Sequence, residues 1–218
     1  MSQLISVNIG RAQPIHNAKI SGKTGIYKQP AQEPILVTPL GLAGDAICDI
    51  ENHGGVDQAV YVYSQTDYAW WALELGYQLA PGTFGENLTV ADLETSGICI
   101  GDRLHVGSVI LEVTSPRVPC VTLAARMGDA AFVKRFRQAE RPGLYCRVIQ
   151  EGYVQPGDEV TLETYAGLTL TAIELFRDFY QPTLSEATLR RYLAAPIAIR
   201  DRLEKEKQLD RLMGQERG

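Results

Sequence analysis

The chain has 218 residues, of which 45% are hydrophobic and 22% are charged, which suits a globular protein with one good core or a core plus a small appendage. The net charge of -5 argues against a nucleic-acid-binding protein, because such proteins need a basic face to displace the counterions of the phosphate backbone. The sequence has neither the long apolar run of a transmembrane helix nor the basic and apolar regions of a signal peptide. We therefore expect a cytoplasmic protein without a membrane anchor.

Residues 1–164 are rich in turn signals and in short runs of strand-forming residues. The predicted strands are residues 5–9, 35–38, 59–63, 98–100, 103–106, 109–113, 144–149 and 159–162. Many short strands at close spacing predict a closed β-barrel or a sandwich. Two predicted helices interrupt them, namely residues 66–73, which end at Gly76, and residues 130–136.

Residues 165–218 predict a small C-terminal module of three short helices. Capping-box patterns at Thr171 and Thr183 open the first two helices, and Pro196 suits the start of the third. The charged run at 204–207 predicts a solvated face. Because so short a segment cannot bury a core alone, the module must pack on the barrel or on a partner. The predicted fold class is mainly β with α additions.

The cysteine pattern excludes a zinc site and points to one thiol. No two of the four cysteines form a C-x-x-C pair, and reduced thiols are the better expectation. Cys99 and Cys146 lie in apolar runs, where we interpret them as packing residues.

Cys120 has a more distinctive setting, because it closes the hexapeptide Ser115-Pro116-Arg117-Val118-Pro119-Cys120. The prolines stiffen the exit from the strand before it, which would hold the cysteine at a sheet edge beside the fixed charge of Arg117. A positive charge favours the thiolate, which is both the nucleophile and the metal ligand. The alternative is a small buried apolar residue without a chemical role.

Several other motifs accompany this hexapeptide along the chain. In order they are Gly44-Asp45, His53-Gly54-Gly55-Val56-Asp57-Gln58-Ala59-Val60, Phe84-Gly85-Glu86-Asn87-Leu88 and Ile100-Gly101-Asp102. Together they resemble the MOSC domain family, which is named for the C-terminal domain of molybdenum cofactor sulfurases. The resemblance is greatest to the stand-alone bacterial branch, the 6-N-hydroxylaminopurine resistance proteins. It covers residues 22–162 and implies a MOSC-type β-barrel, followed by a helical segment as in that branch.

The resemblance also implies roles for the residues of these motifs. Cys120 would be the catalytic residue and would give a thiolate to molybdenum, a metal already held by sulfur atoms of its cofactor. His53, Gly54 and Gly55 would line the cofactor pocket; alternatively they form a tight connector whose histidine bonds a carbonyl group. Arg117 would contact the cofactor's phosphate, or else form a salt bridge at the end of its strand.

Four further residues are expected to contact the cofactor. Lys28 matches a family position and would act electrostatically, although exposed lysines are common. Glu86 or Asn87 would hydrogen-bond the pterin edge, with Asn87 favoured; the alternative is that they close their own loop. Asp57 fits either purpose, as a cofactor contact or as a structural residue.

By resemblance, the expected protein is a molybdenum-cofactor-dependent oxidoreductase that reduces N-hydroxylated small molecules, such as hydroxylaminopurine-type base analogues. The sequence carries no flavin, haem or iron–sulfur motif and no lysine context for pyridoxal phosphate. Electrons would therefore come from a separate reductase, such as a flavoprotein, and a homodimer is compatible with the sequence. The alternative is a sulfur or molybdenum-cofactor carrier that uses Cys120 without redox turnover; a scaffold without any redox role is a third reading.

Overall fold

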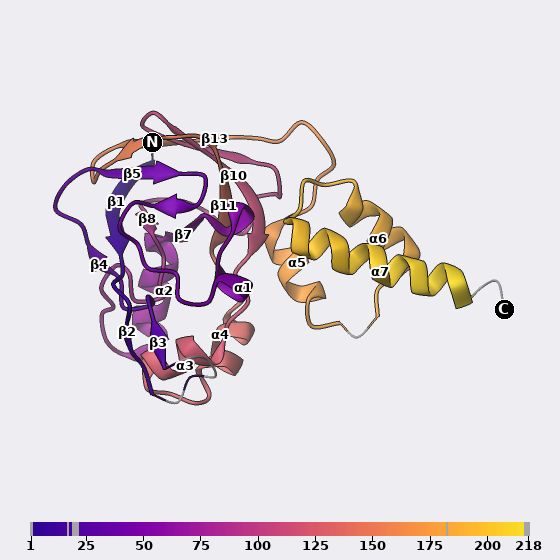
Figure 1. Cartoon of the computed structure of the whole chain (residues 1–218), viewed down its shortest axis with the longest axis horizontal. Helices are drawn as coiled ribbons and strands as arrows, with labels where there is room; N and C mark the ends of the chain where they lie inside the picture. The colour runs from indigo at the N-terminus through magenta and orange to yellow at the C-terminus, as the bar shows by residue number, and fades with distance from the viewer. Residues whose placement is uncertain (1, 17, 19–21, 182, 216–218) are drawn as a thin grey trace.

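A closed β-barrel forms the centre of the computed structural model, which describes residues 2–16, 18, 22–181 and 183–215 (Figure 1). Its seven strands follow the order β13-β9-β10-β11-β7-β8-β1, and β13 pairs with β1 to close the ring. The strands are β1 (Ser2–Ile9), β7 (Val60–Ser64), β8 (Leu88–Val90), β9 (Arg103–Val106), β10 (Val109–Pro116), β11 (Leu144–Gln150) and β13 (Glu159–Glu163). The pairing of β7 with β8 is parallel, and the other pairings in the ring are antiparallel.

Shorter strands accompany the barrel, and one of them joins its sheet. The strand β4 (Gln29–Pro30) pairs with β1, and β2 (Gln13–Pro14) pairs with β3 (Lys23–Thr24). A separate three-stranded sheet contains β5 (Ile35–Thr38), β6 (Gly41–Leu42) and β12 (Gly152–Val154). The barrel strands are rich in Val, Leu and Ile because these side chains pack well on a pleated, buried surface. They fill the main core with residues such as Val7, Val62, Leu104 and Leu111.

A second core, rich in aromatic rings, lies beside the barrel under three helices: α2 (Gln65–Leu75), α3 (Val121–Met127) and α4 (Phe132–Ala139). The α2 helix begins where the Ser64 hydroxyl accepts a hydrogen bond from the Thr66 amide, and it ends at Gly76, whose φ of 79° suits glycine. Trp71, Phe84 and Phe136 belong to this core, and the partly buried Cys120 packs against it. The aromatic core therefore supports the segment that carries the candidate thiol.

The C-terminal helices α5 (Ala172–Asp178), α6 (Glu186–Leu193) and α7 (Ile199–Gln215) project from one side of the barrel (Figure 1). Leu175, Tyr192 and Ile197 belong to the same apolar cluster as the barrel interior, so this module packs on the barrel as its small size requires. Among the described residues, no helix combines the length and the apolar character needed to cross a bilayer.

Asp57 and Arg147 fasten the start of α7 to the barrel. Asp57 lies in the short 3-10 helix η1 (Val56–Gln58), and its Oδ2 accepts a hydrogen bond of 2.7 Å from the Ile199 amide. Its Oδ1 lies 3.0 Å from Nη2 of Arg147, and this nitrogen also donates to the Pro196 carbonyl oxygen at 3.1 Å. The carboxylate thus caps a helix that lies far away in sequence.

Two strand predictions need correction. Residues 98–100 form no strand; Cys99 makes only an isolated bridge with Thr171, and backbone hydrogen bonds join the segment to residues 170–172 at the start of α5. The predicted strand at 109–113 continues to Pro116, which is possible because proline at the end of a strand need not donate to the ladder.

The helix predictions also need adjustment. Helix α3 follows Cys120 directly and was not predicted, because no Ser, Thr, Asp or Asn precedes it as a cap. Ser185 rather than Thr183 caps α6, and α7 begins at Ile199 rather than at Pro196. Lys205 is buried, so the charged run at 204–207 is only partly a solvated face.

Candidate functional site

Cys120 lies where the chain passes from the barrel wall into a helix. Strand β10 ends at Pro116, the next residues stay extended, and Cys120 is the residue before α3, with φ -124° and ψ 168°. Cys120 therefore lies at the start of a helix rather than at the predicted sheet edge. The thiol is half-buried and lines two cavities that meet beside it.

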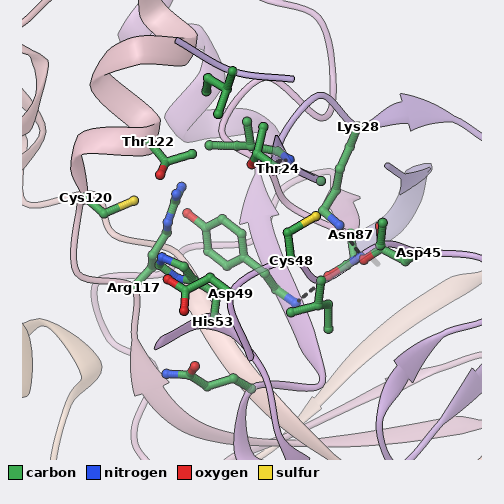
Figure 2. Close-up of a pocket in the computed structure, with 18 of the residues that line it drawn as sticks. Thr24, Lys28, Asp45, Cys48, Asp49, His53, Asn87, Arg117, Cys120 and Thr122 are labelled. Carbon is green, nitrogen blue, oxygen red and sulfur yellow. Dashed lines mark hydrogen bonds and ion pairs between the residues drawn. The ribbon is translucent and has the colours of Figure 1, made fainter. Parts of the chain in front are cut away.

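The inner cavity encloses about 770 Å³ of empty space, part of it open to solvent. Figure 2 shows Cys120, Arg117 and His53 on one side of this cavity and Lys28, Asn87 and Asp45 on the other. These residues come from distant parts of the sequence.

The surroundings of Cys120 favour its ionised form. Burial alone would raise the pKa of the thiol, but a hydrogen bond from the His53 side chain and the positive charge of Arg117 outweigh it and lower the pKa to about 6. His53 is the last residue of α1 (Ile50–His53), a single turn that brings the imidazole to the junction of the two cavities. At neutral pH Cys120 is therefore mainly a thiolate.

Arg117 is a buried cation without a carboxylate partner. Its side chain is only 4% exposed, donates from Nη1 to the Phe84 carbonyl oxygen, and lies 5.2 Å from the centroid of the Tyr61 ring. Within the described part of the chain, its Nε has no hydrogen-bond partner and it forms no ion pair. Because a buried charge is costly without a counter-charge, Arg117 favours an anion in this cavity, and the Cys120 thiolate is the anion that the protein itself supplies.

Lys28 also lies in the cavity wall, but its charge is already neutralised. Its Nζ forms an ion pair with Oδ2 of Asp45, and both side chains are buried. Asp45 also accepts hydrogen bonds from the Gly10 amide at 2.7 Å and from Nδ2 of Asn87 at 2.8 Å. Burial lowers the pKa of Lys28, and the attraction of Asp45 opposes that shift. Lys28 therefore holds the cavity wall together.

Asn87 lines the cavity, yet its side chain is used within the protein. Its Oδ1 accepts from the Tyr61 amide at 3.1 Å, and its Nδ2 donates to Asp45 and, at 3.4 Å, to the Asn8 carbonyl oxygen. All the hydrogen-bonding groups that an amide side chain offers to a ligand edge are thus engaged, apart from the second lone pair of Oδ1. This arrangement matches the loop-closing alternative raised from the sequence.

The structure does not bring four of the predicted residues into either cavity wall. Glu86 is fully buried on the aromatic side of its turn, and Asp57 caps α7. Gly54 packs against Ile50, where a Cβ atom would lie 3.2 Å from the Ile50 Cα, and Gly55 has a φ of 93° that favours glycine. These two glycines shape the turn after His53 without lining a cavity.

Other cavity residues were not identified from the sequence. Tyr61 and Tyr145 form part of the wall, with ring centroids 5.1 Å apart, and Cys48 supplies a second thiol. Gln58 lines both cavities, and its Oε1 has no partner among the described residues. Only Gln58 had a sequence signal, since it lies within the His53 motif; the tyrosines looked like ordinary strand residues.

The donor set at this site is a single thiolate rather than a protein-built metal cage. No group of three or more His, Cys, Asp or Glu side chains converges on a point in the described ranges. One soft sulfur donor beside a guanidinium that pairs with no described carboxylate suits a metal that arrives within an anionic organic cofactor, and it does not suit a metal held by protein ligands alone.

This barrel with a cysteine at its cavity defines a MOSC domain protein. The MOSC domain family matches residues 49–161, and the chain belongs to that family. Its relative YflK from Bacillus subtilis is 38% identical over 159 residues, which cover 73% of this chain and 72% of YflK. YiiM from Escherichia coli is 30% identical over 154 residues, which cover 69% of this chain and 67% of YiiM. The chain is therefore grouped with the stand-alone bacterial MOSC proteins.

Solved structures agree with this assignment. The crystal structure of YiiM from Geobacillus stearothermophilus superposes with a TM-score of 0.79 and 26% sequence identity, and the match covers 96% of this chain and 100% of that one. A protein named reductase from Gibberella moniliformis is 32% identical over 165 residues, but these cover 73% of this chain and only 29% of that much longer protein.

Proposed function

We propose that this protein binds the molybdenum cofactor in the inner cavity, with the Cys120 thiolate as a ligand of the metal, and that it reduces N-hydroxylated compounds in the cytoplasm. The observation that carries this proposal is that Cys120 lies in one cavity with the buried Arg117, a cation that forms no ion pair with a carboxylate of the described residues. Membership of the MOSC family supports binding of the molybdenum cofactor, and the relative named reductase supports a redox activity.

The residues of the cavity suit such a cofactor. Cys120 offers a soft sulfur donor, and Arg117 offers a planar set of donors for a phosphate. Gln58, with its unpartnered Oε1 in the wall, is suited to the donor-rich and acceptor-rich edge of a pterin. His53 keeps the sulfur deprotonated, and Lys28 with Asp45 keeps the opposite wall in place.

When bound, the cofactor would supply the two-electron redox chemistry. The overall reaction would consume two electrons and two protons, cleave the N–O bond of the N-hydroxylated substrate, and release the amine and water. The electrons would come from a separate reductase, such as a flavoprotein. His53 is suited to supply a proton, because its imidazole lies at the junction of the two cavities.

The test is to express the protein in a host that makes the cofactor and to measure molybdenum per chain. We expect about one molybdenum atom per wild-type chain, its loss in Cys120→Ala, and its retention in the matched control Cys99→Ala, a thiol outside both cavities. Reduction of N-hydroxylated substrates is then assayed with an artificial electron donor. A wild-type protein without molybdenum would contradict the proposal, whereas bound molybdenum without turnover, or an added sulfur atom on Cys120, would point to a carrier.

A further inference from the structure

An outer cleft lies between the barrel and the C-terminal helices. It encloses about 1580 Å³ of empty space, part of it open to solvent, and its walls come from the end of β10, from α4, and from α5 and α7. Cys120, His53 and Gln58 line this cleft as well as the inner cavity. A ligand that fills the inner cavity therefore leaves the cleft as a second approach to the thiol.

The cleft has an apolar part that offers a flat aromatic surface. Pro119 and Val133 contribute from the barrel side, and Leu175 and Phe179 contribute from the end of α5. The Phe179 ring contacts Tyr180 with centroids 5.1 Å apart, but its side chain stays 56% exposed. An aromatic ring left open in a cleft is suited to stacking with a planar ligand.

The cleft also has polar and charged groups in its wall. The Ser115 hydroxyl is 3% exposed and has no hydrogen-bond partner in the described part of the chain. Lys205 is buried, with Nζ 5.9 Å from the centroid of the Tyr192 ring. Asp201, one turn before Lys205 on α7, adds an acceptor. A buried hydroxyl without a partner is uncommon and needs an explanation.

We propose that the outer cleft binds the ring of the substrate, a planar nitrogen heterocycle, and that Phe179, Asp201 and Lys205 of the C-terminal module determine its specificity. This inference rests on the proposed function and adds the place where the substrate binds. Phe179 stacks with the ring, Asp201 accepts from its N–H groups, and Lys205 and Ser115 donate to its ring nitrogens. The mixture of donors and acceptors matches a heterocycle edge better than it matches a purely anionic or purely apolar molecule.

The experiment compares wild-type protein with Phe179→Ala and Asp201→Asn, using Phe179→Tyr as a rescue that keeps the ring. Leu203→Ala is the matched control, because Leu203 is an exposed apolar residue of α7 outside the cleft. Adenine, which lacks the N–O bond, is titrated calorimetrically into each protein. KM and kcat are measured with 6-N-hydroxylaminopurine and with hydroxylamine, a substrate without a ring.

We expect Phe179→Ala to weaken adenine binding about tenfold, since stacking of a base on an aromatic ring supplies that much affinity. The KM for 6-N-hydroxylaminopurine should rise by the same factor with kcat unchanged, while hydroxylamine reduction and molybdenum content stay at wild-type values. Phe179→Tyr should restore binding. If the protein is active and loaded with molybdenum, but neither Phe179→Ala nor Asp201→Asn changes its adenine affinity or its KM, this inference is overturned and the proposed function stands. A protein without molybdenum or reductase activity would overturn the proposed function, and adenine titration of that protein would still decide whether the cleft binds the ring.

Discussion

The imidazole of His53 and the thiol of Cys120 meet at the junction of the inner cavity and the outer cleft. His53 comes from a single helical turn before the barrel strand β7, and Cys120 comes from the exit of β10. The two residues are far apart in sequence, but the barrel brings them together, and the His53 interaction lowers the pKa of Cys120. The nucleophilic character of the thiol therefore depends on a residue in another motif.

The first prediction concerns the pH dependence of Cys120 alkylation in the cofactor-free protein. Because the pKa of Cys120 is lowered to about 6, the rate with iodoacetamide should rise with pH around that value and stay high at neutral pH. An ordinary thiol would show its midpoint near about 8.5. His53→Ala should move the midpoint upward. Mass spectrometry of the Cys120 peptide follows the reaction, and Cys48→Ser removes the second thiol of the cavity; a midpoint near 8.5 in the wild-type protein would contradict the prediction.

The second prediction concerns the buried ion pair between Lys28 and Asp45. Lys28→Met should lower the free energy of unfolding by about 3 kcal/mol, because it leaves the Asp45 carboxylate buried without its cation. The double variant Lys28→Met/Asp45→Asn should recover part of this loss. Urea unfolding measures both values, and Lys23→Met is the control, an exposed lysine of the same cavity. Equal stability of Lys28→Met and the wild type would show that the pair contributes nothing.

Much of the barrel could be predicted from the sequence, for a physical reason. The strands β10 and β11 are rich in β-branched and other apolar residues, and β9 and β13 alternate polar with apolar residues; all four lie near clear turn signals, and both patterns fit a pleated surface that is buried on at least one side. The strand β8 (Leu88–Val90) was not predicted, because its first residue closes the motif at 84–88, which was interpreted as a loop. The apolar run at 98–100 was misleading, because Ile98 and Ile100 are apolar as core residues, whereas the backbone makes only the isolated bridge at Cys99.

The candidate site was predictable only in part. The motifs pointed to Cys120, His53 and Arg117, and the structure brings these residues to one cavity. The direction of individual side chains was not predictable: Asn87 faces the cavity, whereas its neighbour Glu86 faces the aromatic core. Adjacent residues in an extended segment point to opposite sides, so a motif alone cannot tell which residue of a pair meets a ligand.

The third prediction concerns the attachment of the C-terminal module through Asp57. Asp57→Ala removes the carboxylate that caps α7 and pairs with Arg147, and it should cost about 1–2 kcal/mol locally. Amide hydrogen exchange in the first turns of α7 should speed up, while exchange in the barrel strands stays slow. Asp210→Ala, a change to an exposed carboxylate of the same helix, is the control. Unchanged exchange at α7 in Asp57→Ala would mean that apolar packing alone attaches the module.

The last prediction concerns Glu86, whose Oε1 accepts hydrogen bonds from the Tyr68 hydroxyl at 2.6 Å, the Gly82 amide at 2.6 Å and the Thr89 hydroxyl at 2.8 Å. Glu86→Ala leaves these three donors without their acceptor and should cost about 3 kcal/mol, whereas Glu86→Gln keeps an acceptor oxygen and should cost less. Burial raises the pKa of Glu86, so the folded protein binds the proton more tightly than the unfolded chain does. The wild type should therefore lose stability relative to Glu86→Gln as the pH rises above about 4.3, the ordinary glutamate value. Urea unfolding at several pH values measures this difference, and a difference that stays constant with pH would show that folding leaves the Glu86 pKa unshifted.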